Sequence, residues 1–484
     1  MDEKIIENKE LSIFEALIPI LVLVGLLAYN VLVAFGDDAL SGSNQFVLLT
    51  GAAVAMLVGF FNKVSYKKMI DEVANNFKST TGAILILLFV GALTGTWMMS
   101  GVIPSMIYYG LMLLSPKIFL AACLIICSII SIATGSSWTT SATVGIALIG
   151  IGKAIGLPLG MVAGAVLSGA YFGDKLSPLS DTTNLAPAMA GADLFTHIRY
   201  MLYTTIPSIT IAFIVFIILG FTQKTTGNAD TSKIMEAIDG AFHITPLLFL
   251  VPIAVIAMVI MKTKPLIALF FGTMFGGIAA IVFQPDIILS ISGETTMSVK
   301  AAYKGMMNAM TVDAAVKTSN TELNDLFSTG GMSGMLGTIW LVICALVFGG
   351  VMDAIGALAR ISSALLSIAN TVFGLFASTV ASCLALNITA SDQYLAIVVP
   401  GKMFAKAYKD KNLAPENLSR TLEDSGTVTS VLVPWNTCGA YQSGVLGVSV
   451  ADYFVYAIFN WISPFMTLLV AAFRIKIKQL KIEA

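Results

Sequence analysis

Long apolar runs recur along the whole chain, and they constrain its fold more than any other feature. A helix that crosses a bilayer needs about 20 mostly apolar residues. The clearest windows of this kind are 14–36, 44–61, 82–100, 118–134, 201–221, 244–261, 265–283, 335–352, 371–388 and 453–473. Only 11% of the 484 residues are charged, against about 25% in average soluble domains. We therefore predict an all-α, polytopic membrane protein.

Other apolar windows contain Gly, Pro, Ser, Thr or Asp in their interior. They are 103–116, 141–152, 158–172, 393–404 and 428–449. Irregular backbone survives at membrane depth only where protein or a water-filled cavity satisfies its polar groups. We therefore expect broken helices and re-entrant hairpins in these windows, and the functional site among them.

The chain also repeats itself. GTWMMSG at 95–101 precedes a polar segment that starts at Thr134, and GVMDAIG at 350–356 precedes one that contains Thr389. Both pairs of landmarks are related by an offset of 255 residues. We predict a first repeat over 1–222, a linker over 223–243, a second repeat over 244–474 and a cytoplasmic tail over 475–484.

Charge predicts that the two repeats face opposite ways, because cytoplasmic loops carry an excess of Lys and Arg. The segment 62–80 is basic, whereas its counterpart at 284–333 is longer and net acidic. The tail at 475–484 is basic, which places the C-terminus inside. Inverted repeats with broken helices near the midplane are typical of secondary transporters. We expect 62–80 to form an amphipathic helix on the membrane surface.

Two polar segments stand out in the first half. TGSSWTTSAT at 134–143 has seven hydroxyl residues in ten, whose oxygens suit Na⁺, although such residues also bond neighbouring helices. In the segment 169–184, Asp174 and Asp181 lie in an apolar neighbourhood with Lys175 as a natural ion partner, and Pro178 breaks the helix. Ionisable groups at membrane depth are costly and usually functional, although a polar surface loop would have the same composition.

Two segments of the second half are related to these. NITASDQ at 387–393 is the repeat mate of 134–143 and has Asp392 where the first half has Ser137. EDSGTVTS at 423–430 is followed by PWNT at 434–437. We expect Asp424 to be functional, and Glu423 is equally consistent with a loop residue.

These strings resemble the NhaC family of Na⁺/H⁺ antiporters. The resemblance rests on GDKLSPLSDTTN at 173–184, with GSSWTT at 135–140, EDSG at 423–426 and PWNT at 434–437, and it covers about residues 12–474. It implies inverted repeats, paired hairpins and an ion site near Ser180, where Asp181 replaces the Asn of the wider superfamily's pattern. Such a site would hold a proton as well as Na⁺. The family also includes Na⁺-coupled malate/lactate exchangers.

We therefore expect a multi-pass antiporter of the bacterial inner membrane that exchanges Na⁺ for H⁺ by alternating access. Na⁺/H⁺-coupled malate/lactate antiport is the alternative, an intramembrane enzyme is a remote one, and a channel is a further one. The expected ion-binding and proton-coupling residues are Asp174, Asp181, Asp392, Asp424, Ser136, Ser137, Thr139, Ser180, Thr182, Thr183, Asn184, Ser391 and Asn436.

The expected partners are Na⁺, H⁺ and the lipid bilayer, with malate or lactate and a homodimer left open. We expect no enzyme, because GxSxG and HExxH are absent and neither His197 nor His243 lies near a candidate nucleophile. We also expect no cofactor apart from the transported ions. The net charge of −1 gives no basic field for nucleic acid.

Overall fold

A computed structural model describes residues 11–35, 42–113, 115–223, 231–318, 324 and 327–480. The first half contains α1 (Ile13–Tyr29), α2 (Ser43–Phe61), α3 (Tyr66–Met99), α4 (Val102–Leu113), α5 (Phe119–Thr134), α6 (Ser137–Thr140), α7 (Ile146–Ala154), α8 (Leu159–Leu176), α9 (Asp181–Ala190) and α10 (Leu194–Thr222). Two π-helical turns, η1 (Asn30–Ala34) and η3 (Ser141–Gly145), continue α1 and join α6 to α7.

The second half contains α11 (Thr231–Ala241), α12 (Leu250–Ile260), α13 (Pro265–Phe283), α14 (Pro285–Ser292), α15 (Val299–Thr311), α16 (Gly331–Gly334), α17 (Leu336–Ala354), α18 (Ala357–Ser367), α19 (Val372–Thr389), α20 (Gln393–Asp410), α21 (Pro415–Leu422), α22 (Thr437–Leu446), α23 (Val450–Phe454) and α24 (Ile458–Ala472). Short turns are η4 (Pro246–Phe249), η6 (Glu423–Thr427) and η7 (Ser430–Leu432). Strands β1 (Ala314–Ala315) and β2 (Ser328–Thr329) form a two-residue antiparallel pair.

The predicted all-α membrane architecture is confirmed. In the described part of the chain, six helices are long and apolar enough to cross a bilayer, or seven if the pair bent by 84° around residues 242–245 counts as one span. Large apolar side chains such as Phe61 on α2, and Phe14 and Phe465 on the shorter apolar helices α1 and α24, are 64% to 83% exposed. Such exposure is costly in water and normal against lipid.

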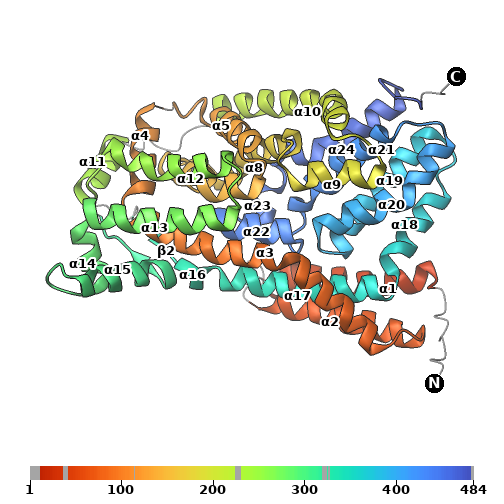
Figure 1. The fold of residues 1–484 in the computed structure, drawn as a ribbon, viewed down its shortest axis with the longest axis horizontal. Helices are drawn as coiled ribbons and strands as arrows, with labels where there is room; N and C mark the ends of the chain where they lie inside the picture. The colour runs from red at the N-terminus through yellow and green to blue at the C-terminus, as the bar shows by residue number, and fades with distance from the viewer. Residues whose placement is uncertain are drawn as a thin grey trace.

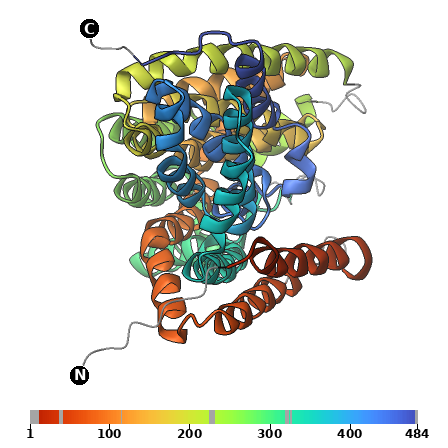
Figure 2. The same cartoon turned by 90° about the vertical axis from the view of Figure 1, so that its right-hand side faces the viewer.

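The helices form two groups, which we name the outer layer and the core bundle. In the outer layer α3 packs against α17, the hairpin α1–α2 packs on α17, and α13 packs on α3. The α1–α2 hairpin of the first repeat therefore packs on α17 of the second repeat, and the α12–α13 hairpin of the second repeat packs on α3 of the first. The core bundle contains α5, α6, α8, α9, α10 and α19–α24. Figures 1 and 2 show α1, α2, α3 and α17 on one side of the molecule and the blue C-terminal helices on the other.

Left-handed backbone recurs at matched places in the two halves. The positive φ angles of the first half, 80°, 68°, 73° and 78°, belong to Gly101, Gly135, Gly156 and Gly191, and those of the second half, 78°, 57°, 61° and 64°, belong to Gly356, Ser391, Asn412 and Gly447. The numbers in each pair differ by 255 once and by 256 three times. This recurrence supports the predicted repeat, whose boundaries and inverted orientation stay predictions.

One expectation about an individual segment changes, and several other segments cannot be compared with the structure. The segment 62–80 is not a separate surface helix, because α3 runs unbroken over 34 residues from its Ser65 N-cap into the apolar span. No Gly or Pro interrupts its polar beginning before Gly82. Parts of the N-terminus, the first hairpin turn, the central linker, the acidic linker and the tail lie outside the described residues; these are 1–10, 36–41, 224–230, 319–323, 325–326 and 481–484.

Candidate functional site

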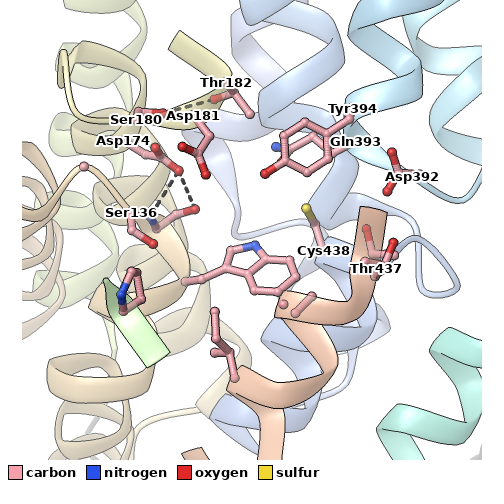
Figure 3. Close-up of a pocket in the computed structure, with 18 residues that line it drawn as sticks. Ser136, Asp174, Ser180, Asp181, Thr182, Asp392, Gln393, Tyr394, Thr437 and Cys438 are labelled. Carbon is pink, nitrogen blue, oxygen red and sulfur yellow. Dashed lines mark hydrogen bonds between the residues drawn. The ribbon is translucent and has the colours of Figure 1, made fainter. Parts of the chain in front are cut away.

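A polar cavity of about 300 Å³ lies where the outer layer meets the core bundle (Figure 3). The outer layer contributes residues of α3 and the first residue of α13. The core bundle contributes the beginnings of four helices and the end of α8. The lining residues are Thr80, Gly82, Ala83, Ile86, Gly135, Ser136, Ser137, Trp138, Asp174, Ser180, Asp181, Thr182, Pro265, Asp392, Gln393, Tyr394, Thr437 and Cys438.

The four helix beginnings share one local design. The chain turns out of a helix, a residue with extended backbone caps the next helix, and that helix starts at the cavity wall. The caps of α6, α9, α20 and α22 are Ser136, Ser180, Asp392 and Asn436, and each side chain accepts a backbone N–H of its own helix. These residue types are strong N-caps, and helix N-termini favour nearby negative charge.

The caps also correct the sequence alignment of the repeats. Ser136 and Asp392 are equivalent, as are Ser180 and Asn436, and both pairs are 256 residues apart. Asp392 therefore replaces Ser136 and not Ser137. The sequence offset of 255 misses this because one extra residue lies between the glycine landmark and the cap in the second half.

Asp174 lies at the floor of the cavity, in the last turn of α8. Its side chain is only 8% exposed. Its Oδ2 accepts hydrogen bonds from the backbone N–H of Ser137 at 3.1 Å and from the Ser137 hydroxyl at 2.7 Å. Both donors lie at the first turn of α6, and they hold the carboxylate through Oδ2.

The other two carboxylates lie elsewhere on the cavity wall. Asp181 is exposed and lies near the mouth, beside the Ser180–Thr182 hydroxyl pair at 3.2 Å. Asp392 is 5% exposed and accepts the backbone N–H of Leu395 at 3.0 Å. Figure 3 shows Asp174 and Asp181 on one side of the cavity and Asp392 with Tyr394 on the other.

Among the described residues, no three His, Cys, Asp or Glu side chains lie close enough together to hold one metal ion. A Na⁺ ion in this cavity would therefore combine one or two carboxylates with hydroxyl or carbonyl oxygens, which are the donors that hard cations prefer. Hydroxyls of Ser136, Ser180 and Thr182 line the wall near the two first-half carboxylates.

Asp424 is not part of the cavity wall. It lies in η6, where it forms a fully buried ion pair with Lys175 and accepts a hydrogen bond from the Thr467 hydroxyl. From the sequence, we expected Lys175 to pair with a carboxylate of its own segment. Its ammonium instead pairs with Asp424, which is 249 positions away. Because Lys175 neutralises Asp424, the negative charge of the cavity comes from Asp174, Asp181 and Asp392.

Other expected site residues are not among those that line the cavity. Their side chains form hydrogen bonds where the helices break. Thr139 donates its hydroxyl to Ser136 Oγ at 3.1 Å, and Thr183 donates to the carbonyl oxygens of Asp174 and Lys175 at 3.2 and 3.1 Å. Asn184 donates to the Ser180 carbonyl at 2.7 Å. These contacts satisfy backbone groups that the broken helices free.

The same holds in the second half. The carbonyl of Ser391 accepts the backbone N–H of Thr437 at 2.9 Å. Asn436 donates its amide to the backbone carbonyl and the side-chain oxygen of Asn387 at 3.1 and 3.2 Å, and Asn387 donates to the Gly426 carbonyl at 2.8 Å. Ion-binding roles for Ser391 and Asn436 remain predictions without support from the cavity lining.

Comparison with known proteins now decides the family. A model of the Na⁺/H⁺ antiporter family matches residues 169–475. The Na⁺/H⁺ antiporter NhaC of Alkalihalophilus pseudofirmus is 37% identical over 416 residues, which cover 86% of this chain and 87% of that protein. This chain belongs to the Na⁺/H⁺ antiporter family. The predicted resemblance to NhaC is therefore confirmed.

Further relatives of this antiporter carry different names. The malate-2H⁺/Na⁺-lactate antiporter of Bacillus subtilis is 38% identical and covers 87% of this chain and 86% of its own length. The arginine/ornithine antiporter ArcD of Halobacterium salinarum is 32% identical and covers 96% of this chain and 92% of its own length. Family membership and the apolar helices make the protein a multi-pass transporter of the bacterial cell membrane.

Sequence reasoning missed several wall residues of the antiporter. Gln393, Tyr394 and Thr437 begin α20 and α22, and Thr80 lies on α3. The repeat offers a signal for the first three: an offset of 256 relates them to Ser137, Trp138 and Asp181. Nothing local marks Thr80, which reaches the cavity only because α3 packs beside the core bundle.

Gly135 allows the first helix break, and replacing it is expected to damage the site. Its φ is 68°, and a Cβ there would lie 2.6 Å from Leu179 Cβ and 3.0 Å from the backbone nitrogen of Ser180. Gly135→Ala should therefore cost about 1–3 kcal/mol of stability and displace Ser180. Thermal unfolding and Na⁺-driven transport of the purified protein would measure both effects.

Gly156→Ala is the matched control. Gly156 has a similar φ of 73°, but a Cβ there would meet nothing within 4 Å. It should carry the backbone strain alone and leave Na⁺ transport close to that of the natural protein. Equal transport in the two variants would contradict a requirement for close approach at Gly135.

Proposed function

We propose that the protein exchanges Na⁺ for H⁺ by alternating access, and that Asp174 is the carboxylate for which the two cations compete. The observation that carries this assignment is the setting of Asp174: it is buried, it lines the cavity, and its Oδ2 is held by the backbone N–H and hydroxyl of Ser137. Neutral ligands would come from the hydroxyls of Ser136, Ser180 and Thr182. Asp181, at the mouth, would attract cations to the site.

Competition at one carboxylate is sufficient to couple the two ions. A proton on Asp174 removes the charge that attracts Na⁺, and bound Na⁺ disfavours the proton. The empty site would carry an unpaired charge at membrane depth, which is costly to move through a low-dielectric barrier. Exchange is obligatory if only the occupied site reorients. Because the cavity walls belong to two helix groups, movement of the outer layer against the core bundle would change its access.

The exchange is tested in everted membrane vesicles with a fluorescent ΔpH probe. Adding Na⁺ should dequench the probe, and choline at equal ionic strength should not. The Na⁺ concentration for half-maximal response should rise as the pH falls, by up to about tenfold per unit in the range where direct competition holds. A half-saturating Na⁺ concentration that is independent of pH would contradict competition at one site.

Malate/lactate exchange is the alternative that the family leaves open. Against it, no Lys or Arg of the described part of the chain lines the cavity, so an organic anion would have to bind at the helix N-termini beside three carboxylates. Counterflow of labelled malate in proteoliposomes separates the two functions. We expect none above the level of protein-free liposomes, whereas Na⁺-dependent malate counterflow would establish the alternative.

A further inference from the structure

The cavity is much larger than a metal ion. Its volume of about 300 Å³ equals the share of roughly ten liquid water molecules, at about 30 Å³ each. A Na⁺ ion with its ligands at Asp174 would fill only the floor. The remaining space is large enough for a small organic molecule.

The charges of the wall also exceed what one Na⁺ ion needs. Asp174, Asp181 and Asp392 all line the cavity, yet they do not gather into a metal-type cluster among the described residues. They lie on two sides of the space instead, with Asp174 and Asp181 on one side and Asp392 on the other (Figure 3). Lys175, the basic residue nearest in sequence, is buried against Asp424 and cannot neutralise them. An extended cation that presents charge at more than one point fits this distribution better than a monatomic ion.

Aromatic rings complete the wall. The Trp138 indole lines the cavity and is stacked on Tyr441, with ring centroids 3.9 Å apart and an interplanar angle of 16°. Tyr441 is fully buried, and its hydroxyl donates to the Trp138 carbonyl at 3.1 Å. This support fixes the indole and covers one of its faces. Tyr394, 41% exposed, lies across the cavity from Asp181 (Figure 3). Aromatic faces attract desolvated cations.

We propose that the cavity also binds a small organic cation with one or two primary ammonium groups, in competition with Na⁺. The ammonium groups would donate to the carboxylates, and the hydrocarbon between them would lie against Trp138 and Tyr394. A dicarboxylate of the same length is excluded by repulsion from three like charges. The proposal rests on the proposed function only in naming Na⁺ as the competitor, and binding of the organic cation itself can be measured without transport.

The test uses three four-carbon probes that differ in charge: 1,4-diaminobutane, 1,4-butanediol and succinate. With full-length protein in proteoliposomes, 1,4-diaminobutane should raise the KM for Na⁺ and leave kcat unchanged, whereas the diol and succinate should not. With purified protein, the diamine should also raise the temperature of unfolding, because a ligand that binds only the folded state stabilises it. If neither KM nor unfolding temperature responds to the diamine at millimolar concentration, the cavity is only a water-filled access path and the proposal is wrong.

A pair of tryptophan variants locates the binding. Trp138→Leu should raise the ratio of the diamine's inhibition constant to the Na⁺ KM by about tenfold, as expected for the loss of a partly desolvated cation–π contact. Trp461→Leu is the control, because Trp461 lies on α24 away from the cavity and donates to the Val455 carbonyl at an exposed position. An unchanged ratio in Trp138→Leu would overturn the placement.

The two failures are distinguishable. If the natural protein shows no Na⁺-dependent proton movement, the proposed function fails, while thermal stabilisation by the diamine still tests the cavity. If exchange is present and neither KM nor stability responds to the diamine, the proposed function stands and this inference fails. If Trp138→Leu does not fold, the probe series on the natural protein decides alone.

Discussion

Asp174→Asn is expected to abolish useful Na⁺/H⁺ exchange. Asn keeps the shape of the side chain and can still accept the hydrogen bonds from Ser137, so the fold should survive. It removes the charge, however, and two unit charges about 4 Å apart interact by about 4 kcal/mol at an effective dielectric constant of 20. The Na⁺ concentration for half-maximal exchange should therefore rise about a thousandfold, and its pH dependence should vanish because Asn does not titrate.

The matched control is Asp452→Asn. Asp452 is an exposed carboxylate near the start of α23, outside the cavity, where it accepts the Ser449 hydroxyl at 2.8 Å. Exchange in everted vesicles, corrected for protein amount, should be close to normal in this variant. If Asp174→Asn retains a half-saturating Na⁺ concentration within about threefold of the natural protein, Asp174 is not the competing carboxylate.

Breaking the buried ion pair between α8 and η6 is expected to have the largest effect on stability. Lys175 and Asp424 are both fully buried, so Lys175→Met leaves the charge of Asp424 without its partner, and Asp424→Leu does the same to Lys175. Removing one partner of such a pair typically costs about 3–5 kcal/mol. Each variant should unfold at a markedly lower temperature in detergent and should accumulate poorly in the membrane.

The double variant Lys175→Met with Asp424→Leu tests the physical reason. It removes both charges and fills similar volume, which in buried pairs is often neutral or stabilising. We expect its unfolding temperature to return close to that of the natural protein, since the losses are limited to the hydrogen bond from Thr467 and the contact of the Lys175 ammonium with the Phe459 ring. If both single variants are as stable as the natural protein, the pair does not hold the two repeats together.

The double variant also separates structure from transport. If Lys175 and Asp424 only hold α8 against η6, the recovered double variant should exchange Na⁺ for H⁺, because neither residue lines the cavity. Loss of exchange in a stable double variant would instead indicate that Asp424 takes part in ion coupling, as its sequence motif predicts.

Local chemistry made much of the fold predictable. Apolar runs of spanning length lead to helices in lipid because only intrahelical hydrogen bonds satisfy the backbone there. Pro178 follows the end of α8, and the left-handed Gly135 caps the end of α5, so the breaks beside Asp174 and Ser136 could be located from the sequence. The repeat was also predicted from the positions of such helix-ending residues. Its alignment was wrong by one residue at Asp392, because the left-handed residue before it is Ser391 and not a glycine.

The cavity was only partly predictable. Ser136, Ser137, Asp174, Ser180, Asp181, Thr182 and Asp392 belong both to the predicted site and to the wall. They share a local signal, since each lies at a helix break in an apolar window. Tyr394 and Cys438 lie at the same breaks but carry side chains that do not suggest ion binding, and Thr80 lies in the middle of α3 without any break.

The sequence by itself determined that this protein is a helical membrane carrier with paired helix breaks and acids at membrane depth, because these properties depend on residues near one another in the chain. Only the tertiary structure decided which acids act together. Lys175 and Asp424 are 249 residues apart, and Trp138 and Tyr441 are 303 apart; each pair meets because helices of opposite repeats pack side by side. That packing pairs Asp424 with Lys175 away from the cavity and leaves Asp174, Asp181 and Asp392 facing it, since a buried charge left without its partner is strongly destabilising.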